Sequence, residues 1–380
     1  MKQRMVVLIV VAFGFFAVCY VPFGCASAER RVRIFDVNDG YVKEVRNAVP
    51  GFTREIAECS PDRLNNTFST LQNARFCGDA KCRSIIRVYD TNATLRCTSF
   101  VPFPDGVYLS PRQFSVCSGK IIFWNSRFSA KGWVGTNELC VATLCDKNSI
   151  TGVKRIAMPS GCSSVLDWEE SFMWSTPTSI VVNVMFERQL TKRIAIVDAV
   201  SGDIRFLSFD VRAGGSLLSS FQCSFSRRFF AVVTRKGEVL ICDGQGNVRN
   251  SISMGHLQTL GLCEVTDLDL EDESLSICWD DGDVLWIFNA NGRYVCIDIE
   301  TNSVIKNGSF SLGMGEKLVG FIQGSRAVIK QKRSPEIIRS IWGNHFYVKD
   351  IDTGNHFAEM PNFVSRYTYL GDGLILLEDL

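Results

Sequence analysis

Residues Ser274–Val304 read SLSICWDDGDVLWIFNANGRYVCIDIETNSV, and they give the clearest indication of the fold. It divides into three short β-type runs, the start of a fourth, and three polar turns rich in Asp, Asn and Gly. Strand-length apolar runs separated by such turns are typical of antiparallel sheet, and the Asn291-Gly292 pair favours a tight hairpin. The stretch therefore predicts one four-stranded antiparallel sheet.

The same unit recurs along the whole chain at steps of about fifty residues. Each copy contains a β-type run that ends in Asp and leads into a polar turn. The seven turn aspartates are Asp36, Asp90, Asp146, Asp198, Asp243, Asp298 and Asp350. This period suits propeller blades of four strands, so the sequence predicts an all-β fold, a seven-bladed β-propeller. Residues Gly51–Cys82 fit the repeat least well, which leaves six or eight blades open.

The two ends of the chain each supply half a blade. Val32–Val37 and Tyr41–Val45 resemble a third and a fourth strand, whereas Ser365–Leu370 and Leu374–Glu378 resemble a first and a second. We expect the N- and C-terminal strands to share one blade, because this closure removes exposed sheet edges. Residues 29–380 would then form a single propeller domain.

The repeats also resemble known propeller families. Phe225–Asp243 is similar to a WD40-type or YVTN-type repeat, with a polar turn, an apolar strand, a Gly turn and an apolar strand ending in Asp. Asp198–Gly202 and Asp350–Gly354 look like the turn of quinoprotein-like propellers. This resemblance implies a fold and no particular activity. No third strand ends in Trp-Asp, and Phe206 and Ala358 stand where quinoprotein-like repeats carry Trp, so we expect no quinone cofactor.

The N-terminus has the pattern of a secretory signal peptide. Lys2 and Arg4 precede the apolar run Met5–Tyr20, and the small residues Ala26-Ser27-Ala28 predict cleavage between Ala28 and Glu29. An uncleaved membrane anchor over residues 1–28 is the alternative, because the apolar run extends to Cys25 and could just span a bilayer. Lipidation at Cys25 ranks last. Each of these interpretations places the body of the protein outside the cytosol: secreted, periplasmic, in the cell envelope, or anchored by a single span.

Composition excludes some partners. The chain has 41 Lys and Arg against 40 Asp and Glu, a formal charge of +1. We therefore expect no nucleic-acid binding driven by charge, and membrane contact only through the N-terminal segment. The basic doublet Arg227-Arg228 is expected to be a solvated surface.

Cysteine and histidine usage favours structural thiols over metal binding. Of the 15 cysteines, Cys19 and Cys25 lie in the leader, and an odd number remains. Cys77 and Cys82 could close a loop as a disulfide. Four others lie in apolar strand runs and are expected to be buried thiols: Cys223, Cys242, Cys278 and Cys296. With no Cys-x-x-Cys pair and three histidines (His256, His345 and His356), we expect no zinc site.

Motifs for catalysis are missing. The chain has no Gly-x-Ser-x-Gly, His-Glu-x-x-His or phosphate-binding Gly-rich loop, so no catalytic, cofactor or metal residue is assigned. The acidic stretches Asp267–Glu273 and Asp280–Asp283 have ligand chemistry suited to calcium, but a solvated connection and a hairpin turn explain them better. Most of the tryptophans are expected to pack between sheets. Three Asn-x-Ser/Thr sequons begin at Asn65, Asn92 and Asn307 and are possible glycosylation sites in a glycosylating organism.

Two functions fit these observations. The first is a binding or scaffold module that takes a protein or a glycan at one end of the ring. The second is a propeller enzyme, such as a quinone-dependent dehydrogenase or a lyase, with its site at the central channel. Clustered, desolvated carboxylates, Arg or His at the channel would favour the enzyme. Fold alone cannot choose, because propellers carry many unrelated functions.

Overall fold

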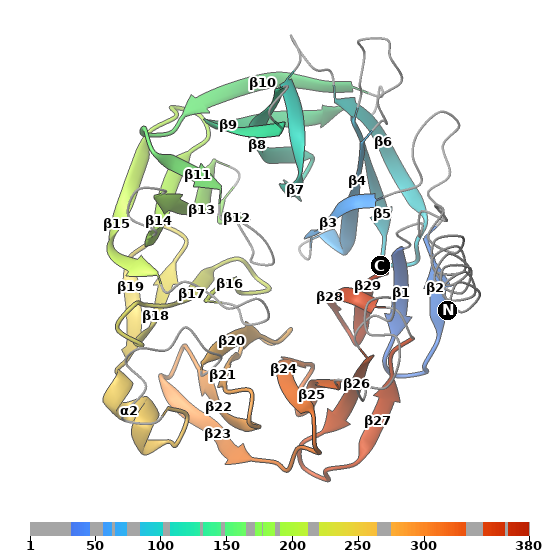
Figure 1. The fold of residues 1–380 in the computed structure, drawn as a ribbon, viewed down its shortest axis with the longest axis vertical. Helices are drawn as coiled ribbons and strands as arrows, with labels where there is room; N and C mark the ends of the chain where they lie inside the picture. The colour runs from blue at the N-terminus through green and yellow to red at the C-terminus, as the bar shows by residue number, and fades with distance from the viewer. Residues whose placement is uncertain are drawn as a thin grey trace, which may run out of the picture.

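The computed structural model describes most of the chain after residue 31. The described ranges are 32–45, 56–62, 65–73, 84–101, 107–129, 132–145, 149–164, 172–176, 178–186, 191–211, 220–263, 275–331, 345–361 and 364–379. The strands form seven antiparallel blades arranged in a closed ring (Figure 1). The predicted seven-bladed propeller is confirmed.

Each blade runs from an innermost to an outermost strand. Blade 1 is β28 (Val364–Gly371), β29 (Leu374–Asp379), β1 (Val32–Asp36) and β2 (Val42–Glu44); blade 2 is β3 (Ile56–Asp62), β4 (Thr67–Asn73), β5 (Ser84–Asp90) and β6 (Leu95–Val101); blade 3 is β7 (Val107–Cys117), β8 (Lys120–Ser129), β9 (Gly132–Cys145) and β10 (Ser149–Ala157). In blade 4, the short strands β11 (Cys162–Ser164) and β12 (Phe172–Trp174) share the innermost position and are followed by β13 (Ser179–Phe186), β14 (Thr191–Asp198) and β15 (Ile204–Val211).

The remaining three blades are regular. Blade 5 is β16 (Phe221–Cys223), β17 (Phe229–Val233), β18 (Val239–Asp243) and β19 (Val248–Ile252); blade 6 is β20 (Ser276–Trp279), β21 (Leu285–Phe288), β22 (Arg293–Asp298) and β23 (Ser303–Ser309); blade 7 is β24 (Glu316–Ile322), β25 (Arg326–Gln331), β26 (His345–Asp350) and β27 (His356–Glu359). A short helix, α2 (Met254–Thr259), follows β19. Ser253 caps this helix, its hydroxyl accepting the His256 N–H at 3.2 Å.

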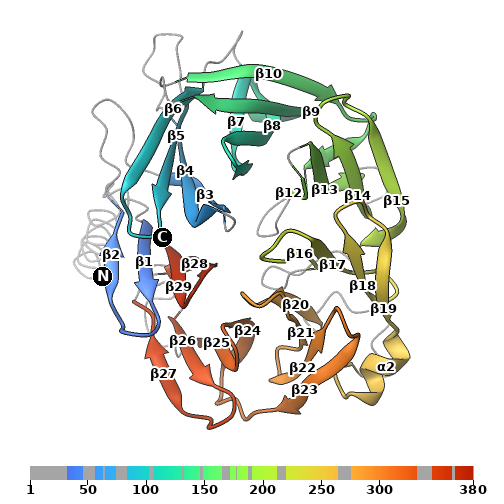
Figure 2. The ribbon, with the colours of Figure 1, turned by 180° about the vertical axis from the view of Figure 1, so that it is seen from behind.

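Strands from the two ends of the chain close the ring in blade 1. β1 pairs with β29 in antiparallel register, with Phe35 opposite Ile375 and Val32 opposite Glu378. Seen from behind, the two strands lie side by side where the colour changes from blue to red (Figure 2). The closure predicted from the leftover half-blades is therefore present.

The core lies between blades, with one hydrophobic cluster at each of the seven junctions. Strand alternation produces this arrangement, because successive side chains of a strand point to opposite faces of the sheet. In β14, Ala195 and Val197 face blade 3, whereas Ile194 and Ile196 face blade 5. The sequence therefore shows near-continuous apolar runs in the middle strands.

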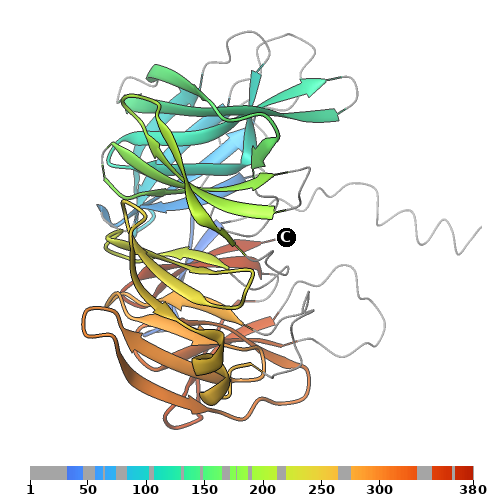
Figure 3. The same cartoon turned by 90° about the vertical axis from the view of Figure 1, so that its left-hand side faces the viewer.

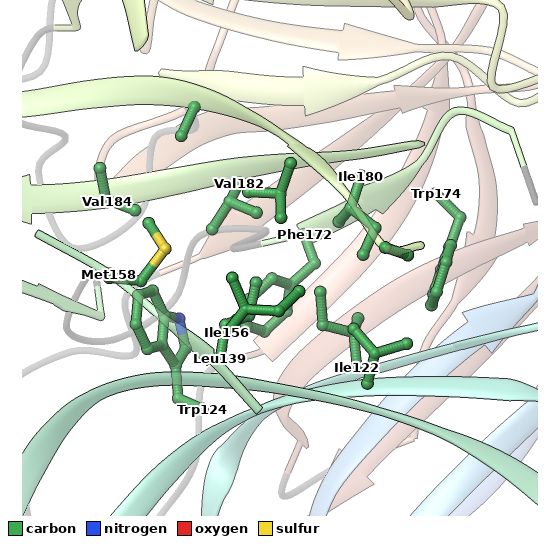
Figure 4. Close-up of a cluster of buried hydrophobic side chains, with 14 of the residues drawn as sticks. Ile122, Trp124, Leu139, Ile156, Met158, Phe172, Trp174, Ile180, Val182 and Val184 are labelled. Atoms are coloured by element: carbon green, nitrogen blue, oxygen red, sulfur yellow. The ribbon is translucent and has the colours of Figure 1, made fainter. Parts of the chain in front are cut away.

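Tryptophan fills these junctions as expected. Between blades 3 and 4, Trp124 and Trp174 lie among Leu139, Phe172 and Val182 (Figure 4). Trp279 and Trp286 are also buried. Large rings suit the space between twisted sheets because they bury more apolar area than aliphatic side chains do.

Candidate functional site

In an antiparallel blade, the turns after the first and the third strands lie at the same end of the ring. We call this end the turn face. The strands run between it and the opposite end of the ring (Figure 3). The chemistry of the turn face follows from three features: the capped turns, the links between neighbouring blades, and one turn that reaches the centre.

Six of the repeat aspartates end the third strand of a blade and begin its next turn: Asp36, Asp90, Asp198, Asp243, Asp298 and Asp350. Asp146 lies outside the described residues. In each turn, Oδ1 of the aspartate accepts at least one backbone N–H from two to four residues later, as at Val200 and Ser201 (2.7 Å each) for Asp198. This side-chain bond fixes the turn locally, which is why Asp recurs there.

The same bonds lower the pKa values of the Asp198, Asp298 and Asp350 carboxyls. The N–H groups of Ser201 and Val200 hold the pKa of Asp198 below its usual 3.8, and those of Thr301 and Glu300 do the same for Asp298. The N–H of Thr353 lowers the pKa of Asp350. A carboxylate that accepts backbone hydrogen bonds is stabilised in its charged form.

These shifts predict an acid-sensitive ring. Because the folded-state pKa of these aspartates lies below the unfolded value, their stabilisation is present above pH 3.8 and is lost as the pH falls through the folded-state pKa. Urea unfolding between pH 6 and pH 2.5 should show a steep loss of stability below pH 4. The triple Asn variant at Asp198, Asp298 and Asp350 should be less stable at pH 6 and show a shallower acid slope. An unchanged slope would contradict this explanation.

Six of the turns on this face, each following the third strand of its blade, also contact the preceding blade. A long polar side chain, which we call a clasp, reaches from one blade to the turn of the next. The clasps are Lys43 to the Asn92 carbonyl, Lys154 to the Val200 carbonyl, Arg205 to the Gln245 carbonyl, Asn250 to the Asn302 side chain, Lys306 to the Asp352 carboxylate, and Arg326 to the Asn38 side chain. Five of the six lie on outermost strands, and Arg326 lies on the second strand of blade 7. They join six of the seven junctions within the described residues.

A sequence signal for these clasps exists and was missed. Five of them follow the turn Asp of their own repeat by seven or eight residues, as Lys43 follows Asp36 and Lys306 follows Asp298. In three of these five blades a β-bulge near the start of the outermost strand precedes the clasp, which is Lys154, Asn250 or Lys306. A bulge re-aims the side chains that follow it, so in these three blades it helps to turn the clasp sideways to the next blade.

One turn leaves this pattern and reaches the centre of the ring. The turn between β16 and β17 in blade 5, Ser224–Arg228, is called the plug below. Arg227 has a left-handed backbone (φ 59°) and its N–H donates to the Ser224 carbonyl at 3.1 Å. Its guanidinium lies 3.3 Å from the carboxylate of Asp62, the last residue of β3 in blade 2. Blades 5 and 2 are not neighbours, so this ion pair crosses the ring.

The ion pair is buried, which corrects the expectation of a solvated Arg227. Arg227 is 8% exposed and Asp62 is 2% exposed. The other carboxylate oxygen of Asp62 accepts from the Asn65 amide at 2.8 Å and from the Ser118 N–H at 3.0 Å. The left-handed turn points Arg227 inward, while its neighbour Arg228 points outward and meets the exposed Glu300. The doublet therefore divides into one buried and one solvated side chain.

The plug touches two further blades. Phe225 packs against Tyr369 of blade 1, with ring centroids 5.4 Å apart. The Ser226 N–H donates to the Asp283 carboxylate of blade 6 at 2.9 Å. Tyr369 in turn donates to Asp281 at 2.9 Å. One five-residue turn thus connects blades 1, 2 and 6 to blade 5.

The acidic turn Asp280–Asp283 is the first turn of blade 6, as the sequence predicted. Asp280 is buried, which raises its pKa, and it accepts hydrogen bonds from the N–H groups of Gly282 and Val284 and from the Trp286 ring at 3.1 Å. Its oxygens therefore cap a turn and anchor a tryptophan. The stretch Asp267–Glu273 lies outside the described residues.

Buried Arg and carboxylate at the centre meet the requirement of a channel enzyme only in part. Asp62 is bonded to Arg227, Asn65 and Ser118, and Asp283 to the plug backbone. Nη1 of Arg227 is buried with no hydrogen-bond partner in the described part of the chain. The nearby thiol of Cys117 is buried, which raises its pKa and keeps it protonated. Asp62, Arg227 and Asp283 are therefore used in contacts between blades.

Ten of the cysteines in the described ranges are thiols outside any disulfide, and nine of these ten are buried. Cys223, Cys242, Cys278 and Cys296 are among these nine, so they are the buried strand thiols that the sequence predicted. Burial raises the pKa of the Cys242 and Cys296 thiols to about 12, which makes them unreactive near neutral pH. The possible disulfide between Cys77 and Cys82 lies outside the described residues, as does the cleavage site at Ala28 and Glu29.

Two histidines come together in blade 7. Tyr347 contacts the rings of both His345 and His356, with centroid distances of 6.2 and 5.1 Å. His345 is paired with Glu359 at 3.3 Å. Among the residues described, no three metal-ligating side chains gather. Nor is any helix in those ranges long and apolar enough to cross a bilayer.

Exposed apolar side chains gather on the outermost strands. Nine of the ten large ones in the described ranges lie on such a strand or in the turn before it: Tyr41, Val42, Leu95, Val153, Val200, Val248, Val304, Ile305 and Phe357. Every blade contributes at least one. We call this circle of side chains the rim. The tenth, Met314, lies between β23 and β24.

Comparisons with known proteins found similarity to solved structures at low sequence identity. No protein-family model and no curated protein matches the chain. Raptor of Chaetomium thermophilum is similar over 93% of this chain and 29% of its own length (12% identity, TM-score 0.45). The C-terminal WD40 domain of Sif2 is similar over 92% of this chain and 89% of its own length (11% identity, TM-score 0.46). BamB of Moraxella catarrhalis is similar over 92% of this chain and 91% of its own length (9% identity, TM-score 0.42).

The strand order defines the class of protein. The chain is a seven-bladed β-propeller in which strands from both ends of the chain share one blade. Its distinguishing features are the plug that ties opposite blades and the clasps that join neighbouring ones.

Proposed function

We propose that this protein is an exported binding module, or a membrane-tethered one, that holds a protein partner against its rim. The observation that carries the proposal is the placement of exposed apolar side chains, nine of ten on the outer strands or the turns before them. Single exposed apolar residues are ordinary on any surface. A set with at least one exposed apolar side chain in every blade is a repeated feature of the fold. Apolar side chains suit a protein surface best as their partner.

Rigidity supports the same proposal. The side chains of the rim stand on short capped turns and on strands that the clasps join to neighbouring blades. A surface held in one conformation loses little entropy when a partner binds. One arc of the rim lies on the adjacent blades 3, 4 and 5. It consists of Val153 (44% exposed), Val200 (68% exposed) and Val248 (50% exposed).

The arc can be tested directly with a matched control. The full chain, isolated from its native source after mild cross-linking, should yield a protein partner that is recovered about tenfold less with the triple Ser variant at Val153, Val200 and Val248. Met314→Ser removes an equally apolar, fully exposed side chain away from the rim and should retain the partner. Equal recovery with both variants would contradict the proposal, as would a partner that proves to be a glycan.

Export is tested separately by the intact mass of the native protein. A chain that begins at Glu29 would support cleavage after Ala28, and one that begins at Met1 in a membrane fraction would support the anchored form. A full-length chain in the cytosol would contradict both. Turnover of a small substrate that is lost in Arg227→Met, with the fold intact, would favour the enzyme alternative.

A further inference from the structure

The three sequons differ in how free their asparagines are. All three asparagines lie at the surface. Asn65 follows β3 and belongs to the plug contacts, whereas Asn92 lies in the turn of blade 2 and Asn307 lies on β23. An N-linked glycan replaces one of the two hydrogens on the side-chain nitrogen, so the hydrogen bonds of that nitrogen decide whether the folded protein can carry one.

The Asn65 side chain is fully engaged. Its Nδ2 donates to the Asp62 carboxylate at 2.8 Å and to the Ser118 hydroxyl at 3.3 Å. Asp62 is the buried partner of Arg227. A sugar on Asn65 would remove one of these two donors and would need room beside a buried ion pair. We therefore expect the folded ring to exclude it.

The other two asparagines are free. Only the backbone of Asn92 forms hydrogen bonds. Its N–H donates to the Asp90 carboxylate at 3.0 Å and its carbonyl accepts from Lys43, so its side chain stays exposed. Asn307 lies on the outermost strand of blade 6, where every residue except Lys306 is exposed. Neither side chain has a hydrogen bond to another described residue. Each can take a glycan without loss of a contact.

We infer that Asn92 and Asn307 carry N-linked glycans and that Asn65 does not. The inference rests on the export that we propose above. The donor would be a polyprenyl-diphosphate oligosaccharide. Nδ2 of the asparagine attacks the anomeric carbon, an N–C bond forms, the C–O bond to the diphosphate breaks, and the amide proton passes to a base of the transferase. No electron transfer is involved.

These positions would shape the binding surface. Asn307 shares β23 with the exposed Val304 and Ile305, and Asn92 lies close in sequence to Leu95 at the start of β6. Glycans there would shield the rim of blades 6 and 2, and would block edge-to-edge pairing of the exposed strand β23. The arc of Val153, Val200 and Val248 has no sequon and would stay open. The glycans would thus keep a partner away from the rim of blades 2 and 6.

The test determines which asparagines carry a glycan in the full chain from its native source. An amidase that releases N-glycans, used in heavy-oxygen water, converts each occupied asparagine to labelled Asp, which peptide mass spectrometry locates. Label at Asn92 and Asn307, with unmodified Asn65, is the expected result. In addition, Asn307→Gln and Ser309→Ala should each remove one glycan from the intact mass, whereas Asn65→Gln should leave the mass of the glycans unchanged and lower the melting temperature.

The outcomes separate this inference from the proposed export. Label at Asn65 in folded protein, or an unlabelled Asn92 or Asn307 in a chain that begins at Glu29, overturns the glycan assignment and leaves export standing. An unlabelled chain that begins at Met1 in the cytosol overturns both.

Discussion

Arg227→Met should lower the free energy of unfolding by about 3–5 kcal/mol, because it leaves the buried carboxylate of Asp62 without its cation. The pair is 3.3 Å apart, and the two side chains are 10% and 3% exposed. Urea unfolding followed by tryptophan fluorescence measures the loss. The double variant Arg227→Met/Asp62→Leu should regain part of it, because replacement of a whole buried pair by apolar groups is far less costly than removal of one partner.

The adjacent arginine provides the control. Arg228→Met removes an ion pair with Glu300 in which both side chains are more than 60% exposed, and it should change stability by roughly 1 kcal/mol or less. Equal effects at Arg227 and Arg228 would show that the buried pair does not hold the ring.

Trp286→Ala should also cost about 3–5 kcal/mol. Trp286 is 2% exposed and stacks on Phe321 of blade 7, with ring centroids 4.2 Å apart. Its ring N–H donates to the buried carboxylate of Asp280 at 3.1 Å. The Ala variant therefore opens a cavity at the junction of blades 6 and 7 and deprives Asp280 of a donor.

The two contributions of Trp286 can be separated. Trp286→Phe keeps a stacked ring and removes the donor, so it should cost about 1–3 kcal/mol. Val304→Ala, on an exposed strand of the same blade, should change little. A Phe variant as unstable as the Ala variant would mean that the hydrogen bond, and not packing, dominates at this junction.

The fold could be predicted because the signals that define it are local. Asn289 shows the principle: its Oδ1 accepts the N–H groups of Asn291 and Arg293, and Gly292 follows with a φ of 89° that few other residues adopt. Each such turn fixes the register of two strands, and the repetition of the turns at a constant spacing indicates a ring of similar blades. Ring closure was predictable for the same reason, since the half-blades at the two ends need each other.

The plug could not be predicted because its partners are distant in sequence. Arg227 and Asp62 are 165 residues apart, and neither stands in a motif. Arg227 itself has the left-handed backbone that points its side chain inward and leaves Arg228 pointing outward. Sequence patterns do not predict such a conformation. The clasps lie between these cases. Their spacing after the turn Asp is visible in the sequence, but the neighbouring turn that each of them reaches is not.

Hydrogen exchange in Arg227→Met would show whether the plug holds the ring together. The central claim is that a turn of blade 5 holds blades 1 and 2 across the ring. Mass spectrometry of peptides should therefore show faster exchange in the plug and also in β3 and β28, with Arg228→Met changing only peptides around its own turn and that of Glu300. Faster exchange confined to blade 5 in Arg227→Met would contradict the claim.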